Sequence, residues 1–540
     1  MERVDYYRHI LDQLKNDRRP KVEIWKETSS IFAPSRELLI KNYEAGPNYS
    51  PQDEKIGADL FATEAIHAKN LMVDGIFGHM CAPSIEWQKY EMVESELNKR
   101  GEVKEWLWKL ERHMYSVFDR SNFYPAITRY INDGVTLGTA IIDIKPNPSK
   151  GYPVYMVRHP INCYIAENEF EEVDTMFREF SLTARVAVEM FPRAKLDQDI
   201  IQAADDEPHK KFAFVHVIHP RTAYRKGSPF AKDFPYASIY FRSDGDQTVL
   251  KEGGYREFPI PIWRWRVDSN EIWGRAPCED ALWDGKQVNG MSKTMLLSAQ
   301  RSADPPWQGP IELKGKMSLR PGKFNYWYDP GRIATPMETA SNYPIGVNEL
   351  DRKLQSINQH MHTDFFLMLH EANREMTATE VIERMGEKIS VLAATIGQFQ
   401  KEGLERIVER SIQIEVEAGR APEPPDSVQG QELKIRMVGP LAQAQQRVTK
   451  NQGVMRGLQQ AAMAFQMNPQ AADVVEWDET VRDIFESNGM PEKNLKRKSE
   501  IRRARREREV QMAQQQQMEL LQSPNATKRP EEGSLIEQST

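Results

Sequence analysis

One segment of the sequence comes close to a phosphate-binding loop. Residues 309–316, GPIELKGK, contain two glycines and a lysine, as do the loops whose backbone N–H groups hold nucleotide phosphates. The segment has one residue too many between its glycines, and Met317 stands where a magnesium-binding Ser or Thr is needed. Pro321 also prevents a long helix from following. The sequence therefore predicts no nucleotide site here.

Histidines that lie near one another in the sequence raise a second possibility, metal binding. On a helix His360 and Asp364 share a face but His362 does not, and on a strand His216 and His219 point to opposite sides. Neither group has a third ligand at a useful spacing. The nucleophile motifs of hydrolases do not occur in the sequence. We therefore predict structural or surface histidines, no metal, no cofactor and no enzymatic activity.

Residues 262–267, IWRWRV, alternate two tryptophans with two arginines. Such a pattern can form a stacking platform for single-stranded nucleic acid. On a strand, however, Trp263 and Trp265 point to one face and Arg264 and Arg266 to the other, as in any sheet with one buried side. The second interpretation is favoured, with the tryptophans in the core.

Residues 493–508, KNLKRKSEIRRARRER, form the most basic run, with nine Lys or Arg. Because a helix turns about 100° per residue, Arg502, Arg505 and Arg506 can share a face, which leaves Arg503 to pair with a glutamate of another subunit. One interpretation is a solvated helix with internal ion pairs, and the other is contact with DNA or an internal partner. Both fit the sequence.

Length and composition describe a folded protein of several domains. The chain has 540 residues, of which 40% are hydrophobic and 28% charged, so two to four domains are expected. A net charge of −7 argues against binding nucleic acid by bulk charge alone. No apolar run is long enough to span a membrane, so no membrane insertion is predicted. The three widely spaced cysteines are expected to be reduced thiols.

The periodicity of apolar residues predicts the order of the elements. Helical spacing dominates residues 1 to about 130, and from about 134 to 270 the period changes to two, in short runs separated by turn residues. We therefore predict helices followed by a mixed domain with an antiparallel sheet and one helix near residues 183–191.

Two long helices then frame a small region rich in proline and glycine. Pro277 fits a first helical turn and prolines follow the other end, so one helix is predicted over 277–303. Gly285 and Gly290 each destabilise this helix by about 1 kcal/mol relative to alanine. Their presence indicates a close helix–helix approach. A second helix is predicted over 346–369, with short strands between the two in a segment too small for its own core.

A third helix is predicted within residues 377–432. Thr377 and Glu380 have the spacing of a capping box, which marks a helix start and leaves residues 370–376 as a kink or loop. Beyond a linker rich in proline we predict a helical region over 433–521 and a disordered tail over 522–540.

This order of elements and the amino-acid sequences of three segments resemble those of the head-to-tail connector (portal) proteins of short-tailed bacteriophages. The segments are LMVDGIFGHMCAPSIEW (71–87), IWGRAPCEDALWDGKQVNGMSKTMLLSAQRSADPPW (272–307) and REMTATEVIERMGEKISVLAATIGQFQKEGL (374–404). The match runs from about residue 5 to 430 and is looser in the C-terminal helical region. It is most specific in the middle segment, where Gly-Arg-x-Pro, Asp-x-Lys-x-x-Asn and Asp-Pro-Pro occur in order.

The resemblance implies an α+β, mainly helical portal fold, assembled as a ring of twelve subunits at one vertex of the phage head. It implies a channel for double-stranded DNA along the ring axis, used in packaging and ejection. The implied parts are a wing (1–276), two stem helices (277–303 and 346–369), a clip (304–345), a tunnel loop (370–376), a long helix with the rest of the wing (377–432), a crown (433–521) and a tail (522–540).

The resemblance also implies partners and contact residues. Terminase and later a tail adaptor would dock at the clip, capsid and scaffolding proteins would surround the ring, and internal core proteins would meet the crown. The candidate channel side chains are Asn373, Arg374, Lys286 and Lys293, the crown side chains Arg502, Arg505 and Arg506, and the clip side chains Trp307, Phe324, Tyr326, Trp327 and Tyr328. The alternative function is a DNA-binding structural or scaffold protein of the head interior, which would use the basic run.

Overall fold

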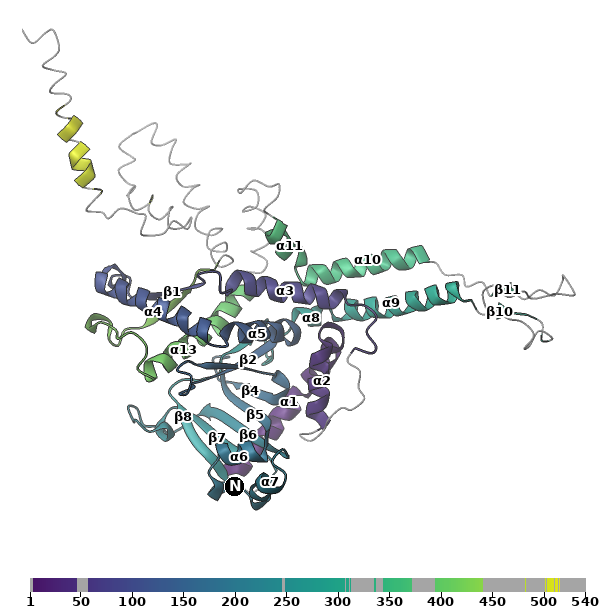
Figure 1. The fold of residues 1–540 in the computed structure, drawn as a ribbon, viewed down its shortest axis with the longest axis horizontal. Coiled ribbons are helices and arrows are strands. Elements are labelled where there is room, and N and C mark those ends of the chain that lie inside the picture. Colours follow the sequence, from purple (N-terminus) through teal and green to yellow (C-terminus); the bar gives the residue numbers. More distant parts are fainter. Residues whose placement is uncertain are drawn as a thin grey trace, which may run out of the picture. The chain divides into compact units, whose positions relative to one another are not determined.

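The computed structural model describes most of the first 439 residues and a few near the C-terminus. The described ranges are 3–45, 57–244, 248–305, 307–309, 311, 335–336, 343–371, 394–439, 481, 501, 503–508, 510–512 and 514. The chain divides into two compact units, Met1–Gln445 and Gln446–Thr540. The first unit is a mixed lobe of helices and antiparallel sheets from which one pair of helices extends (Figure 1). The predicted class, α+β and mainly helical, is confirmed at this level.

Helices dominate the N-terminal part, as predicted. They are α1 (Arg3–Phe32), α2 (Pro34–Ala45), α3 (Glu64–Met80), α4 (Gly101–Arg120) and α5 (Phe123–Leu137). In the largest core cluster Trp87 stacks on Phe123 with ring centroids 5.7 Å apart, and Phe118 lies 4.4 Å from the same ring. Gly138 caps the C-terminus of α5, has a φ of 78° and abuts the backbone of Gly274. A side chain at either glycine would therefore overlap the backbone of the other.

A three-stranded antiparallel sheet follows α5. Its strands are β2 (Thr139–Lys145), β3 (Val154–Arg158) and β9 (Ile262–Arg264), with β2 in the centre. The first six residues of β2 are all buried, which means that both faces of this strand are covered.

The second sheet is a five-stranded antiparallel meander. Its strands, in spatial order, are β4 (Cys163–Glu167), β5 (Val173–Thr183), β6 (Lys211–Pro220), β7 (Tyr236–Arg242) and β8 (Val249–Tyr255). Helix α1 packs on one face, while α6 (Ala184–Met190) and α7 (Gln198–Asp206) pack on the other. Helix α7 was not predicted, because only Ile200 and Ala203 of its nine residues are buried.

A two-stranded pair corrects one predicted boundary. Strand β1 (Gln88–Met92) pairs antiparallel with β12 (Leu433–Met437), so the helical region predicted from residue 433 begins instead with a strand. Ile435 and Met437 point toward the core at alternate positions. Five residues are too few for this period of two to be recognised in the sequence. Before it run a π-helical turn, η6 (Phe399–Glu405), and α13 (Arg406–Glu417).

Helices are present at both positions predicted for the stem, but each is broken once. The first consists of α8 (Pro277–Asp280) and α9 (Leu282–Ala303), and the second of α10 (Tyr343–His360) and α11 (Thr363–Glu371). The second break occurs at His362, whose φ of 48° lies in the left-handed region. Between Ala303 and Tyr343 the structure describes residues 304–305, 307–309, 311 and 335–336, in which the short strands β10 (Trp307–Gln308) and β11 (Thr335–Pro336) pair antiparallel.

Candidate functional site

The base of α9 is fixed in the lobe by a close approach and by hydrogen bonds to α10. A Cβ at Gly285 would lie 2.8 Å from Cγ2 of Ile31, so this glycine lets α9 touch α1, as predicted. Asp284 accepts hydrogen bonds from Nζ of Lys353 (3.0 Å) and Oγ of Ser356 (2.6 Å). Burial alone raises the pKa of Asp284, but these two hydrogen bonds outweigh it and lower the pKa. The two helices are thus joined at their base by charge as well as by packing.

The two lysines predicted to face a channel are engaged within the chain. Nζ of Lys286 lies 2.8 Å from a carboxylate oxygen of Glu27 and 4.6 Å from the ring centroid of Trp283. Nζ of Lys293 lies 5.1 Å above the ring of Phe61. Both lysines remain partly or fully exposed, so a role in contacting DNA stays a prediction.

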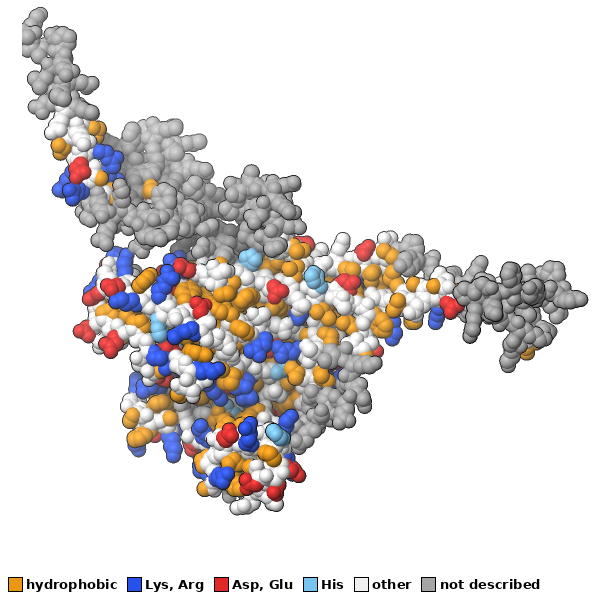
Figure 2. All heavy atoms as spheres, viewed as in Figure 1, with side chains coloured by type: hydrophobic (Ala, Val, Ile, Leu, Met, Phe, Trp, Pro, Cys, Tyr) orange, Lys and Arg blue, Asp and Glu red, His pale blue; other side chains and the backbone are white. Residues whose placement is uncertain are grey.

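Along its length α9 carries apolar side chains that the rest of the described chain leaves largely exposed, and hydrophobic side chains are visible at the surface of the α9–α10 pair in Figure 2. Trp283 is 67% exposed, and Leu296 and Leu297 are 49% and 44% exposed. Gly290, in the same helix, has no described atom outside the local helix backbone within 4 Å of where a Cβ would be, unlike Gly285. The close approach predicted from both glycines is therefore made at one of them and left open at the other.

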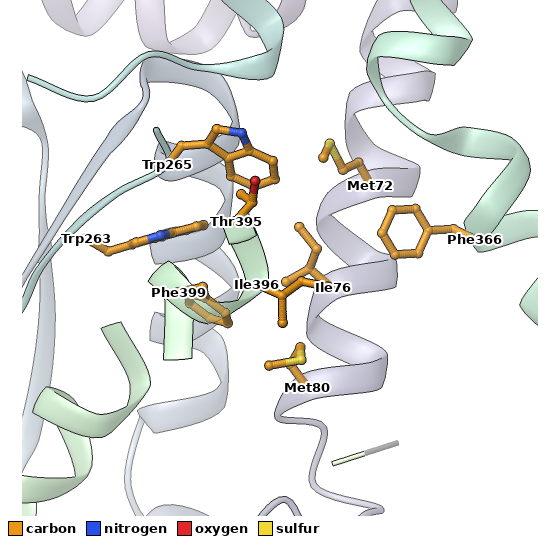
Figure 3. A pocket seen from close by; sticks show the side chains of 9 residues that line it. All are labelled: Met72, Ile76, Met80, Trp263, Trp265, Phe366, Thr395, Ile396 and Phe399. Atoms are coloured by element: carbon orange, nitrogen blue, oxygen red, sulfur yellow. The ribbon is translucent and has the colours of Figure 1, made fainter. Parts of the chain in front are cut away.

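Helix α11 is anchored where the predicted tunnel loop begins. The ring of Phe366 occupies the space of a missing side chain at Gly75 of α3, where a Cβ would overlap it. Beside it lies a pocket of about 20 Å³, around which Ile76 and Met80 of α3 meet Trp263, Ile396 and Phe399 in Figure 3. The lining residues are Met72, Ile76, Met80, Trp263, Trp265, Phe366, Thr395, Ile396 and Phe399. This volume holds about one water molecule, so the pocket is a gap in packing.

Several predicted contact residues lie outside the described residues. Asn373 and Arg374 of the tunnel loop, Phe324, Tyr326, Trp327 and Tyr328 of the clip, and Arg502 of the crown are among them. Residues 370 and 371, assigned to the loop, form the last turn of α11. Trp307 in β10 is 42% exposed.

Part of the basic run is described in the second unit. Arg505 and Arg506 are exposed on a helical segment over 503–508. Arg503, expected to pair with another subunit, donates through Nε to Glu507 of its own helix at 3.0 Å. An ion pair inside the helix is what the solvated-helix interpretation predicts for this residue.

The tryptophans of IWRWRV are in the core, as the favoured interpretation predicted. Trp263 is fully buried and Trp265 nearly so. The expectation that both arginines face solvent is wrong for Arg264, which is 6% exposed. Its guanidinium pairs with Glu167 and, at 2.9 Å, with Glu402, because the β4–β5 turn and η6 cover the second face of β9. Arg266 is exposed and pairs with Asp280.

The paired histidines make separate contacts. Nε2 of His216 lies 2.9 Å from Oγ of Ser238, and its ring stacks on Tyr240 with centroids 3.9 Å apart. Nε2 of His219 lies 2.8 Å from the hydroxyl of Tyr7. In the described ranges no three His, Cys, Asp or Glu side chains converge on a point that could hold a metal ion. The three cysteines are buried and unpaired, and no helix among the described residues could cross a membrane.

Comparison with known proteins places this chain among bacteriophage proteins. It matches the bacteriophage head to tail connecting protein family over residues 5–495, and therefore belongs to this family. It is 26% identical to the "Portal protein" of Salmonella phage epsilon15 over 527 residues, which cover 94% of this chain and 91% of the relative. It is also 26% identical to the "Probable portal protein" of Bordetella phage BPP-1 over 488 residues, 88% of this chain and 86% of the relative.

The chain is thus a phage portal, or head-tail connector, protein. It is a structural component of the virion at the portal vertex, and not an enzyme. Family membership implies an oligomeric ring with links to capsid and tail. The predicted resemblance is confirmed, and it decides against the alternative of a scaffold protein of the head interior.

Proposed function

We propose that twelve copies of this chain form a closed ring and that double-stranded DNA passes along its axis, inward during packaging and outward during ejection. Residues 1–276 and 377–432 form the wing, 277–303 and 346–369 the stem helices, 304–345 the clip and 370–376 the tunnel loop. The crown extends to residue 521 and follows β12, which pairs with β1. Family membership supports the ring. The α9–α10 pair, which extends from the lobe in Figure 1, supports the stem assignment.

The observation that carries the proposal is the uncovered side of α9. A helix that protrudes from a lobe and exposes Trp283 and Leu297 on one side leaves apolar surface in water. A closed ring covers such a surface with the neighbouring subunit, because its contacts join two different patches of identical chains. The open position at Gly290 lets the neighbour's backbone come close.

Electron micrographs of purified protein test this directly. The double variant Trp283→Ser with Leu297→Ser should give subunits in place of rings with a central hole, since two apolar contacts per interface are lost. The matched control, Trp283→Phe with Leu297→Met, keeps the apolar area and should keep the rings. Rings of unchanged abundance in the Ser variant would contradict the assignment of α9 to the subunit interface.

The proposed DNA path combines a mainly acidic wall with a few cations. Twelve chains of net charge −7 give a strongly acidic ring, along which a polyanion can move without sticking. Lys286, Lys293, Asn373 and Arg374 supply weak, transient contacts near the stem and the tunnel loop. Deleting residues 371–375 should reduce retention of the packaged genome, whereas unaltered assembly, packaging and retention would exclude a gating role.

The crown supplies the second set of cations in this proposal. Arg502, Arg505 and Arg506 repeat around the ring and hold the DNA end electrostatically, an attraction that weakens steeply with salt. Changing the three to Gln should lower both the affinity of rings for DNA and its salt dependence. If the variant rings bind DNA with the same affinity and the same salt dependence as wild type, the basic run is a solvated helix without a role in DNA binding.

We place the docking of terminase and then of the tail adaptor at the clip. The support is its aromatic content, Trp307, Phe324, Tyr326, Trp327 and Tyr328, in a segment too short to bury them all. Changing Trp327 and Tyr328 to Ala should keep rings intact yet weaken capture of terminase, and undiminished capture would count against this docking site. Capsid and scaffolding proteins would contact the wing, and internal core proteins the crown.

A further inference from the structure

The three-stranded and five-stranded sheets of the lobe pack against each other across a layer that is only partly apolar. In one core cluster Ile141 of β2 packs with side chains of β4, β5 and β6. Because side chains alternate along a strand, Asp143 and Lys145 lie on the same face of β2 as Ile141. Arg158 of β3 lies directly opposite Ile141 and shares this face. The three-stranded sheet thus turns one acid and two bases toward the five-stranded sheet.

The five-stranded sheet adds a third base to this layer. Arg178 of β5 stands two positions after Met176, which packs with Ile141 in the same cluster, so Arg178 also points toward the three-stranded sheet. Burial lowers the pKa of Arg178, and repulsion by Arg158 lowers it further. Burial is also the main cause of the lowered pKa of Lys145, to which both arginines contribute by repulsion. The three bases are therefore close enough to repel one another.

The three bases share one carboxylate. Nη2 of Arg158 lies 2.8 Å and Nζ of Lys145 3.4 Å from Oδ2 of Asp143. Burial raises the pKa of Asp143, but attraction by these two cations outweighs it and lowers the pKa, so the carboxyl group is ionised. The guanidinium of Arg178 lies 4.6 Å from the ring of Phe180 and, among the described residues, takes part in no hydrogen bond or ion pair. Three positive charges against one negative leave two positive charges in excess.

The histidine in this layer does not alter the balance of charge. His216 of β6 lies opposite Arg178, and its Nε2 is 2.9 Å from Oγ of Ser238. Burial lowers the pKa of His216 well below its usual value, and repulsion by Lys145 lowers it further. The imidazole is therefore neutral.

A fourth base borders the layer. Arg410 of α13 is buried, and its Nη1 donates to Oε1 of Gln413 at 2.7 Å. Burial lowers the pKa of Arg410, while the carboxylates of Glu417 and Glu257 attract it without forming an ion pair. Its charge is thus partly balanced from outside the layer, and the excess of two positive charges is counted without it.

The unbalanced cations have hydrogen-bond donors to spare. Nε of Arg158 and Nε of Arg178 are buried without a partner among the described residues. Arg158 bonds its neighbours through Nη2 alone, which leaves Nη1 as well. A buried charge without a partner is costly, and the fork of an arginine matches two oxygens of an oxyanion. The side chain of Lys145 is 31% exposed, so water and small ions reach the layer at this side.

We propose that Lys145, Arg158 and Arg178 bind a free tetrahedral dianion, such as hydrogen phosphate, between the two sheets. Its two negative charges match the excess, and its oxygens accept from the Arg178 fork, which no described residue uses. The bound ion joins the two sheets of the lobe by charge. Packed sheets lie about 10 Å apart, which leaves room for a small oxyanion but not for a DNA duplex. The site is complete in one subunit and does not rest on the proposed ring.

Calorimetric titration of the full chain with phosphate, in a chloride buffer of constant ionic strength, measures the binding. Wild type should bind one ion per subunit. Arg178→Gln should raise the dissociation constant by at least about tenfold, the loss expected when hydrogen bonds to a charged group are removed. Arg178→Lys keeps the charge without the fork and should lie between the two. The matched control is Lys211→Gln, which removes an exposed cation of β6 and should bind as wild type does.

Thermal unfolding separates a binding role of Arg178 from a structural one. Phosphate should raise the midpoint of wild type, because it binds only the folded chain. In chloride Arg178→Gln should unfold at the same temperature as wild type or a higher one, since the lost cation is repelled and unpaired. In phosphate it should unfold below wild type. A residue needed only for packing would lower the midpoint in both media. If Arg178→Gln does not fold, Lys145→Gln takes its place.

Four results would overturn the site. The first is a wild-type midpoint that is equal in phosphate and in chloride. The second is phosphate binding that Arg178→Gln leaves unchanged, which would place the ion elsewhere. The third is a 30-base-pair duplex that competes with phosphate and is lost with the same variant, which would assign these cations to DNA. The fourth is a folded Arg178→Gln chain that fails to form rings in chloride, because a carboxylate of a neighbouring subunit would then occupy the site. Wild type that binds phosphate but forms no rings would contradict the proposed function and leave this site standing.

Discussion

Two glycines in one helix should respond in opposite ways to the same substitution. Replacing an exposed glycine inside a helix with alanine stabilises the helix by up to about 1 kcal/mol. At Gly290 nothing in the described part of the chain opposes this gain, since no described atom outside the local helix backbone lies within 4 Å of the added methyl. At Gly285 the methyl would lie 2.8 Å from Cγ2 of Ile31 and 3.4 Å from the ring of Phe32. Overpacking of this kind costs about 1–3 kcal/mol, which equals or exceeds the gain.

Hydrogen exchange of the α9 amides in isolated subunits measures these changes where they occur. We expect Gly290→Ala to slow exchange by up to about fivefold and Gly285→Ala to speed it or leave it unchanged. In the ring proposed above, with α9 at the subunit interface, the methyl at Gly290 would meet the neighbouring subunit. Gly290→Ala should therefore weaken assembly while it stabilises the subunit. Faster exchange in Gly290→Ala subunits, or rings that are unaffected, would refute the reasoning.

Three further predictions concern the lobe. Arg264→Ala should lower the free energy of unfolding in urea by about 3–5 kcal/mol, because two carboxylates lose their buried partner; a loss below about 1 kcal/mol would contradict this. Phe366→Ala should lower it by about 3 kcal/mol and speed exchange in α11, whereas Leu367→Ala, at a 45% exposed position, should change little. Burial lowers the pKa of His159 to about 3, so the folded imidazole stays neutral while that of the unfolded chain takes up a proton below about pH 6.5. Above pH 6.5 the imidazole is neutral in both states and the free energy of unfolding does not depend on it. By pH 5 the free energy of unfolding should fall by about 2 kcal/mol, because only the unfolded chain binds the proton, and His159→Asn should remove this pH dependence.

Local signals made part of the fold predictable. Pro277 marks the start of the first stem helix, and prolines after residue 304 mark its end, because proline acts on its own backbone and that of its neighbour. The strands between residues 139 and 255 could be recognised because most of them are apolar runs of seven or more residues bounded by turn residues. Helix α7 and strand β12 were missed because a few buried positions carry too little periodicity.

Contacts between distant segments were not predictable. The break at His362 turns Phe366 onto Gly75, a residue almost three hundred positions earlier, and no local pattern announces it. Arg264 looked solvent-facing because alternation reports two faces of a strand but not what covers the second. The family could be recognised from sequence, yet the channel and clip residues it implied are still predictions.

The surfaces that remain uncovered in the folded subunit indicate how it assembles. In the sequence Gly285 and Gly290 carry the same helix penalty, and Trp283 stands in a pattern that a buried helix would also show. In the folded chain Ile31 packs against Gly285, whereas Gly290 faces open space on the side of α9 that carries the exposed Trp283 and Leu297. A monomer would gain nothing from that second penalty. A closed ring of identical chains requires such complementary, unpaired surfaces, and it is there that the subunit interface should be sought.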